Sequence, residues 1–284
     1  MSDAPSYAAP VEIGAVMIGG TISEVVSSDV AGFAVGDWVV AFGGWQDYAL
    51  SDGTGVINTG KSPANPSWAL GMPGLTAWAG LTQIGQPKAD ETLVVAGASG
   101  PVGATVGQIG KILGLRVVGI AGGSKKCTHV VDTLGLDACL DYNARGFPEA
   151  LKAAVPDGID IYFENVGGAV FDAIMPLLNT SARIPVCGLI SQYNATSLPK
   201  GPDRTSSLIG QILRKRLTMR GFIVFDDFGQ LYPEFFKQMG EWVKQGKIQY
   251  REEMINGMER VSAVFVGLLR GEAFGKRVIK LSDK

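Results

Sequence analysis

A glycine-rich stretch in the middle of the sequence has residue types and spacing that could hold a nucleotide. Gly97, Gly100 and Gly103 stand three residues apart, after the apolar run at 92–96 and before an amphipathic stretch. The first glycine would permit a sharp turn, the second a close approach by a diphosphate, and the third tight packing of helix on strand. Pro101 suits the first position of a helix, whose free N–H groups and positive dipole end would face the phosphate. The stretch therefore predicts a nucleotide-binding turn.

The spacing alone leaves a second interpretation open. Ala98 stands where the usual G-x-G-x-x-G fingerprint has its first glycine. A glycine-rich strand-to-helix junction that binds no ligand is therefore the alternative.

The end of the next apolar run, 116–121, indicates which nucleotide would bind. An NAD site usually has Asp or Glu there to bind the ribose 2′-hydroxyl. This run is followed by "GGSKK", which contains no acid, and Lys125 and Lys126 could instead pair with a 2′-phosphate. The pattern favours NADP, and the alternative is a pair of solvated lysines at the start of a helix.

These residues need a scaffold of strands and helices to bring them together. From Thr92 onward, helical segments separate short apolar runs, which we expect to be strands at 92–96, 116–121, 138–142, 160–166, 183–188 and 218–223. This alternation predicts an α/β fold with a doubly wound parallel sheet.

The two ends of the chain have a different pattern. Residues 19–28 and 37–50 are rich in β-branched and aromatic residues, and the tail after Tyr250 has the pattern strand, helix, strand. We expect a nucleotide-binding domain over 65–250 and a smaller β domain over 1–64 and 251–284.

Composition narrows the class of protein. The formal net charge is −2 and the lysines and arginines are dispersed, so nothing indicates a nucleic-acid partner or an anionic membrane surface. The chain has two long uncharged stretches, 62–87 and 92–110, and proline and glycine interrupt both. We therefore expect no membrane span. The first residues have no signal-peptide pattern. The chain has three cysteines, which lie far apart in the sequence. These features predict a reduced, cytoplasmic protein.

The sequence lacks the residues that several enzyme classes need for catalysis. His129 is the only histidine, which argues against a catalytic zinc site and against a Ser-His-Asp triad. No tyrosine has the lysine four residues later that a short-chain dehydrogenase needs. The segment 55–62, "GVINTGKS", matches the P-loop pattern, but no buried strand precedes it and Pro63 and Pro66 follow.

Longer stretches identify a family. The chain resembles the zinc-independent medium-chain reductases, in particular the prostaglandin, alkenal and curcumin reductases, in "VGDWVVAFGGWQDYAL", "LGMPGLTAWAGL", "LDYN", "FENVGG", "CGLISQYN", "RGFIVFDDFG" and the glycine-rich stretch. The resemblance implies a Rossmann domain with a GroES-like β domain. It also implies NADPH-dependent reduction of the C=C bond of α,β-unsaturated ketones and aldehydes, and a homodimer.

The resemblance also implies roles for particular residues. Tyr193 would be catalytic and would lie beside the substrate and the nicotinamide. Three further residues would line the substrate site, namely Met72, Thr76 and Trp78. The cofactor would lie against Gly97, Ser99, Gly100, Pro101, Val102, Gly103, Gly123, Lys126, Tyr142, Asn165, Cys187, Gly188, Phe222 and Val224.

Two departures from the family pattern keep alternatives open. Ala273 stands where family members usually have an asparagine that touches the cofactor. Family members also carry some dozens of residues before the point at which this chain starts, so the β domain is expected to be incomplete. The alternatives are therefore an NADPH-dependent quinone reductase and a catalytically impaired NADPH-binding protein.

Overall fold

The computed structural model describes residues 9–61, 70–195, 197 and 201–281, and it divides into two compact units. The larger unit comprises residues 68–253 and 265–277, and the smaller one residues 3–67, 254–264 and 278–284. Residues 265–277 belong to the larger unit, and its glycine turn and a lysine bond to their main chain, as described below.

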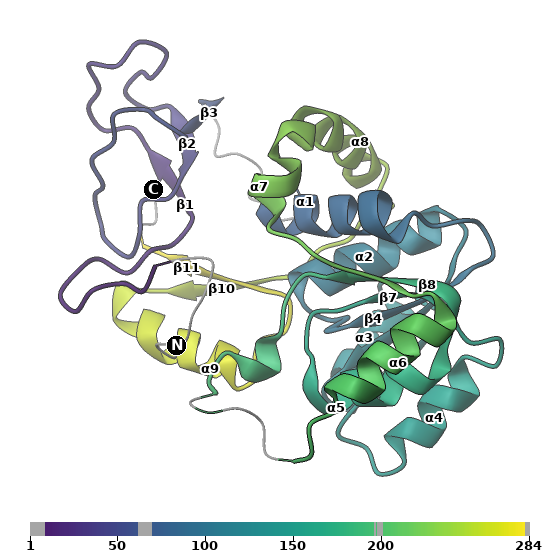
Figure 1. Ribbon diagram of the computed structural model, residues 1–284. Helices are drawn as coiled ribbons and strands as arrows, with labels where there is room; N and C mark the ends of the chain where they lie inside the picture. Colours follow the sequence, from purple (N-terminus) through teal and green to yellow (C-terminus); the bar gives the residue numbers. More distant parts are fainter. Residues whose placement is uncertain (1–8, 62–69, 196, 198–200, 282–284) are drawn as a thin grey trace. The chain divides into compact units, whose positions relative to one another are not determined.

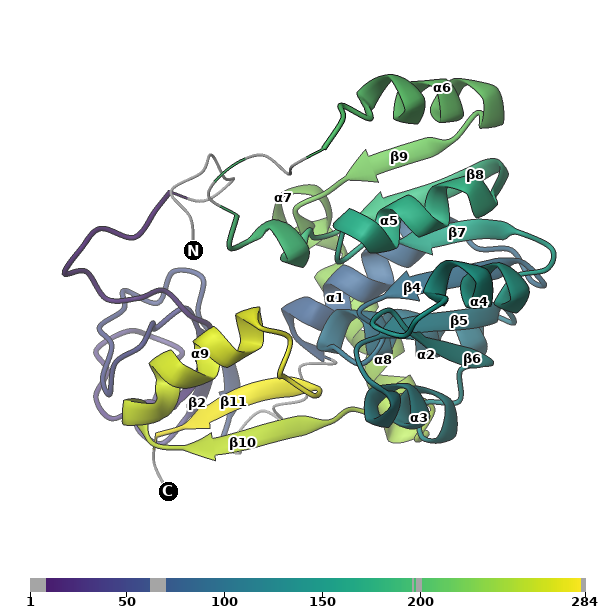
Figure 2. The ribbon, with the colours of Figure 1, turned by 90° about the horizontal axis from the view of Figure 1, so that it is seen from below.

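A six-stranded sheet forms the centre of the larger unit (Figure 2). Its order is β6-β5-β4-β7-β8-β9, and every neighbouring pair is parallel. The predicted doubly wound sheet is therefore confirmed. Its strands are β4 (Thr92–Ala96), β5 (Arg116–Ala121), β6 (Ala138–Asp141), β7 (Ile159–Phe163), β8 (Leu178–Val186) and β9 (Thr218–Gly221).

Helices cover both faces of the sheet, because alternate strand residues point to opposite sides. In β4, Leu93 and Val95 enter one buried cluster, whereas Val94 and Ala96 enter another. The first cluster packs under α1 (Met72–Ala79), α2 (Pro101–Ile112), α3 (Ser124–Asp132), α7 (Val224–Phe228) and α8 (Tyr232–Lys244). The second packs under α4 (Phe147–Ala154), α5 (Gly168–Ile174) and α6 (Thr205–Lys215), shown together in Figure 1.

The strand order reverses between β4 and β7, from which the chain continues outward in both directions. The carboxyl ends of parallel strands meet at one edge of a sheet, and ligands of such folds bind at the point of reversal. The loops that follow the six strands carry most of the predicted site residues. The fold therefore brings those loops to one edge.

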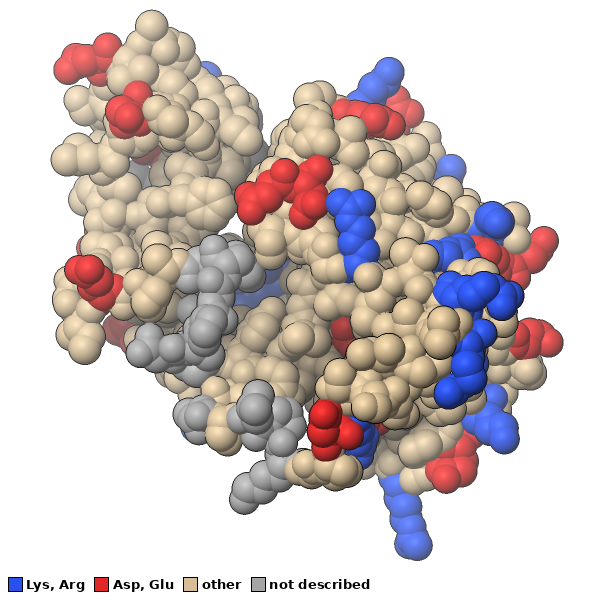
Figure 3. All heavy atoms as spheres, in the orientation of Figure 1, with Lys and Arg blue, Asp and Glu red and all other residues tan. Residues whose placement is uncertain are grey.

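The smaller unit contains an antiparallel sheet of β1 (Thr21–Glu24), β2 (Trp38–Ala41) and β3 (Ile57–Gly60). Few of the side chains that Figure 3 shows on this unit are charged, and several large apolar ones are exposed, including Phe42 and Leu50. The tail forms β10 (Glu252–Asn256), α9 (Val261–Leu269) and β11 (Lys276–Lys280), with β10 paired to β11. This confirms the predicted strand, helix and strand.

Three local features differ from the sequence analysis or extend it. Helix α6 was not predicted, because none of its residues is buried and only a few apolar side chains reach the core. Helix α1 is followed directly by a π-helical segment, Gly80–Gly85. Among the described residues, no helix has the length and apolar character needed to cross a membrane.

The P-loop match forms no phosphate loop in its described part. Residues 57–60 are strand β3, paired with β2. The Lys61 Nζ lies 2.7 Å from an Asp37 carboxylate oxygen and 2.9 Å from the Val35 carbonyl. The hydrogen bond from Lys61 is the main cause that lowers the pKa of Asp37 to about 2. Lys61 thus holds a turn of the smaller unit, and Ser62 lies outside the described residues.

Candidate functional site

The glycine turn joins β4 to α2 in the way the sequence predicts. Gly97 has φ +66°, and its carbonyl accepts the N–H of Gly100 at 2.9 Å. A Cβ on Gly103 would overlap that same carbonyl, so only glycine lets α2 lie this close to the turn. Gly100 precedes the helix without a side-chain cap, and Pro101 is its first residue. The N–H groups of the first turn therefore face outward, as a diphosphate site requires.

Gly103→Ala is expected to lower the free energy of unfolding by about 1–2 kcal/mol, because the added methyl group forces the turn open. Gly240→Ala in α8 is the matched control, since its methyl group would meet no atom of another element within 4 Å. It should raise the free energy of unfolding by about 0.5–1 kcal/mol. Urea unfolding measures both variants. A Gly103→Ala protein as stable as wild type would contradict the close packing.

The segment after β5 meets the segment after β6 around a lysine. The Lys126 Nζ donates to the Gly271 carbonyl at 2.7 Å, and burial lowers the pKa of this lysine. The Tyr142 hydroxyl lies 3.0 Å from the position that a Cβ on Gly122 would take, and 4.0 Å from the corresponding position at Gly271. Two of the predicted cofactor-binding residues, Lys126 and Tyr142, therefore converge.

A carboxylate fixes the turn that carries this lysine. Asp141 Oδ1 accepts the N–H of Gly123 at 2.9 Å and the N–H of Asn143 at 3.0 Å, and these bonds lower its pKa. Gly123 has φ +91° at the start of α3. On the same edge, the Gly275 N–H donates to the Ser99 carbonyl at 3.2 Å, which ties the tail of the unit to the glycine turn. No sequence pattern predicts this contact.

The ends of β7 and β8 bring together three more predicted residues. The Asn165 side chain donates to the Ala96 carbonyl, just before the glycine turn, at 2.8 Å. A Cβ on Gly188 would meet the Tyr193 hydroxyl at 3.1 Å and the Asn165 carbonyl at 3.5 Å. The Tyr193 hydroxyl thus lies over the joined ends of the two strands.

Cys187 lies beside these residues but has no activated thiol. Burial, with a further contribution from the Glu164 carboxylate, raises the pKa of Cys187 to about 12. A thiol is nucleophilic only as the thiolate. Cys187 therefore has no nucleophilic role at neutral pH, and a predicted contact with the cofactor would involve its main chain or the neutral thiol.

Sequence reasoning missed Glu164, the residue after β7. Its side chain is 1% exposed, and one carboxylate oxygen accepts the N–H groups of Val166 at 2.6 Å and Gly167 at 2.8 Å. Burial raises its pKa. The one available signal was an acid directly after an apolar strand, in "FENVGG".

The side chains of four predicted site residues mainly make contacts within the protein. Phe222 and Val224 belong to the buried cluster under α1 and α8, so their main chain is the part available to a cofactor. The Trp78 indole is buried, and its N–H donates to Gln238 at 2.5 Å. The Thr76 hydroxyl donates to the Met72 carbonyl within α1.

Met72 differs from those four residues. It is the first residue of α1, and its side chain is 48% exposed. Of the predicted substrate residues on α1, it is the one whose side chain is open to a ligand.

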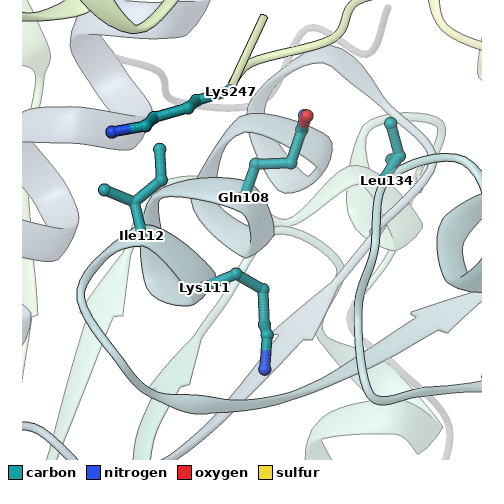
Figure 4. A pocket seen from close by; sticks show the side chains of 5 residues that line it. All are labelled: Gln108, Lys111, Ile112, Leu134 and Lys247. Atoms are coloured by element: carbon teal, nitrogen blue, oxygen red, sulfur yellow. The ribbon is translucent and has the colours of Figure 1, made fainter.

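A pocket of about 300 Å³ lies at the other end of α2 and is lined by Gln108, Lys111, Ile112, Leu134 and Lys247. Its polar groups do not converge, and Figure 4 shows the ends of Lys111 and Lys247 pointing apart. Gln108 is hydrogen-bonded to the main chain of Ala104 and Gln249. Lys111 pairs with Asp137 at 2.8 Å. This pocket therefore offers no chemistry comparable with the strand ends.

Within the described residues, no three His, Cys, Asp or Glu side chains form a group that could hold a metal ion. His129 packs edge-on against Phe274, with 4.9 Å between ring centroids, and burial lowers its pKa. His129 therefore has a packing role.

Two family models match the chain, "N-terminal domain of oxidoreductase" over residues 1–59 and "Zinc-binding dehydrogenase" over residues 101–245. The chain is 58% identical to the NADPH-dependent curcumin reductase of Escherichia coli (strain K12), over 99% of this chain and 83% of that protein. It is 39% identical to rat prostaglandin reductase 1, over 93% of this chain and 81% of the relative.

Solved structures resemble it as well. CurA from Vibrio vulnificus in complex with NADPH superposes with a TM-score of 0.96 at 58% identity, covering 99% of this chain and 85% of CurA. The quinone oxidoreductase of Escherichia coli in complex with NADPH has a TM-score of 0.76 at 17% identity, over 97% of this chain and 85% of the other. At that identity the second match shows the fold alone.

Proposed function

The chain belongs to the zinc-independent, NADPH-dependent medium-chain reductases, and we propose that the edge of the sheet described above is its reduction site. It is an oxidoreductase that reduces the C=C bond of α,β-unsaturated ketones and aldehydes with NADPH. The observation that carries this conclusion is the 58% identity to a curcumin reductase over 99% of the chain. We propose residues 65–250 as the NADP-binding domain and residues 1–64 with 251–284 as the substrate domain.

The glycine turn, the α2 N-terminus and Lys126 form a cradle that fits a dinucleotide. The diphosphate would lie against the first-turn N–H groups of α2, and the 2′-phosphate against Lys126 and Tyr142. The Lys126–Gly271 bond of 2.7 Å supports this assignment, because it holds the ammonium group at the sheet edge. The turns at Asn165 and Gly188 would then lie toward the nicotinamide end.

NADPH, when bound, supplies the hydride that reduces the β-carbon of the enone. Negative charge then develops on the carbonyl oxygen of the substrate, and a hydrogen-bond donor aimed at that oxygen lowers the barrier. We assign this donor role to the Tyr193 hydroxyl, which lies over Gly188 and the Asn165 carbonyl. Tyr193 or water would protonate the α-carbon, and Met72 would contact the substrate.

The direct test mixes the purified chain with NADPH and trans-2-hexenal, a simple alkenal, and follows the loss of NADPH absorbance. NADH and a simple quinone are the controls for cofactor and substrate class. We expect alkenal turnover with NADPH and little with NADH. Turnover of the quinone alone would point to a quinone reductase, and NADPH binding without turnover to an impaired binding protein.

We also propose that the protein is a homodimer that joins through the β9 edge of the sheet. Strand β9 has one neighbour in the sheet, and Leu213 of the adjoining α6 is 77% exposed. Leu213→Glu is expected to convert a dimer to a monomer in light scattering, because it buries a charge in the contact. Leu50→Glu, at an exposed apolar residue in a loop of the smaller unit, is the control and should leave the mass unchanged. A dimer in both variants would contradict the proposed interface.

The proposed location is the cytoplasm. Cys127, Cys139 and Cys187 are free thiols, which is the usual state of cysteines in a reducing compartment.

A further inference from the structure

Glu164 lies directly after β7, among the elements that form the reduction site. Its Oε1 accepts two N–H groups, from Val166 at 2.6 Å and from Gly167 at 2.8 Å. One carboxylate therefore fixes the whole turn between β7 and α5.

The main chain of the same residue joins this turn to β8. Its N–H donates to the Pro185 carbonyl at 2.9 Å, and its carbonyl accepts the N–H groups of Cys187 at 3.0 Å and Gly188 at 3.3 Å. Glu164 thus sets how far the loop after β8 lies from the loop after β7.

The 165–167 turn that Glu164 holds also supports Tyr193. The Asn165 carbonyl accepts the N–H of Ile190, and the Val166 carbonyl accepts the N–H of Ser191, both at 3.1 Å. Tyr193 follows the short helical turn Ile190–Gln192 directly. A short, continuous chain of hydrogen bonds therefore runs from the Glu164 carboxylate to the residue that carries the proposed proton donor.

The charge of Glu164 does not itself stabilise the fold. Burial raises its pKa despite the two N–H bonds and the neighbouring Tyr162 hydroxyl. A carboxyl group whose pKa is higher in the folded state makes folding less favourable as the pH rises and the group ionises. What Glu164 contributes is therefore the place and direction of its acceptor oxygen.

We propose that Glu164 is a positioning residue for the reduction: by accepting the N–H groups of Val166 and Gly167 it holds the 165–167 turn, and through that turn the Tyr193 hydroxyl. The proposal rests on the proposed role of Tyr193. Displacing a reacting group by a fraction of an ångström lowers the rate without abolishing the fold.

Three variants separate acceptor geometry from charge. Glu164→Gln keeps an acceptor oxygen and removes the charge, so kcat for trans-2-hexenal should stay within about threefold of wild type. Glu164→Leu removes the acceptor, and kcat should fall about 10- to 30-fold. The Kd for NADPH, from fluorescence titration, should change by no more than about threefold, because the glycine turn and Lys126 are untouched. Hydrogen exchange of the Val166 and Gly167 amides should quicken in Glu164→Leu and stay slow in Glu164→Gln.

Asp160 offers a matched control at the opposite end of β7. Its carboxylate accepts the N–H of Thr92 at 2.9 Å and a side-chain N–H of Asn179 at 2.8 Å. Asp160→Leu should lower the melting temperature and leave kcat unchanged. An equal loss of kcat in Asp160→Leu and Glu164→Leu would mean that general destabilisation is the cause, and would overturn the proposal.

Other outcomes also test the positioning role of Glu164. A folded Glu164→Leu with wild-type kcat, or a Glu164→Gln as slow as Glu164→Leu, would overturn the positioning role. If Glu164→Leu does not fold, Glu164→Asp replaces it, since a carboxylate one methylene shorter retracts from both N–H groups. Its kcat should fall several-fold, and an unchanged value would overturn the proposal. A wild-type protein inactive toward the alkenal would instead overturn the proposed function on which this role rests.

Discussion

Tyr193→Phe is expected to lower kcat for trans-2-hexenal by about 100-fold, the usual loss when one donor to a developing oxyanion is removed. The phenylalanine ring keeps the packing of the tyrosine and loses only the hydroxyl that lies over Gly188. The interaction is proposed for the transition state, so kcat and kcat/KM should fall together. The Kd for NADPH should stay within about twofold, because no glycine-turn or lysine contact changes.

Tyr232→Phe is the control for this substitution. The Tyr232 hydroxyl donates to the Leu70 carbonyl at 3.0 Å at the start of α8, which is a structural bond. Removing it should lower the melting temperature and leave kcat within about twofold, since one neutral hydrogen bond contributes about 1 kcal/mol to stability. Steady-state kinetics and thermal unfolding on the three proteins give the comparison. A Tyr193→Phe enzyme as fast as wild type would remove Tyr193 from the reaction and leave water as the proton donor.

The sheet was predictable because its strands are buried on both faces. In β4 every residue is buried, with Leu93 and Val95 on one side and Val94 and Ala96 on the other. Such runs carry a strong apolar signal that needs no knowledge of the partner strands. Helix α6 gave no such signal, because its buried contribution is limited to partly covered residues such as Leu208 and Ile212.

The site was only partly predictable, because its geometry depends on residues far apart in the sequence. Glycine spacing identified the turn at Gly97, whereas the bond from Gly275 to Ser99 has no local pattern. Glu164 was missed because an acid after a strand is a common turn residue, and because its main-chain carbonyl bonds to Cys187 and Gly188, which lie in another loop.

Family resemblance implied ligand contacts for some residues whose side chains are buried. Phe222 and Trp78 are two of them, and their side chains pack into the core. A segment can border a ligand through its main chain while its side chains face inward, and the sequence does not distinguish the two arrangements.

Lys126→Ala is expected to raise the Kd for NADPH about 100-fold and to leave the Kd for NADH within about threefold, because a charge-assisted contact with phosphate contributes about 1.5–3 kcal/mol. Its ammonium group is held by the Gly271 carbonyl at 2.7 Å and is partly buried, which lowers its pKa. A 2′-phosphate would restore the solvation that burial removes from the ammonium. NADH has no such phosphate, so its Kd should change little when the lysine is removed.

Lys125→Ala is the matched control, since Lys125 is the exposed neighbour on the same helix. It should change the Kd for NADPH by no more than about twofold, because an exposed charge at longer range is screened by salt. The wild-type Kd for NADPH should also rise with salt concentration, and this dependence should weaken in Lys126→Ala. Equal losses for NADPH and NADH in Lys126→Ala would show that the lysine supports the α3 turn through Gly271 and does not bind phosphate. Discrimination between the cofactors would then have to come from Tyr142, and Tyr142→Phe would be the variant in which it disappears.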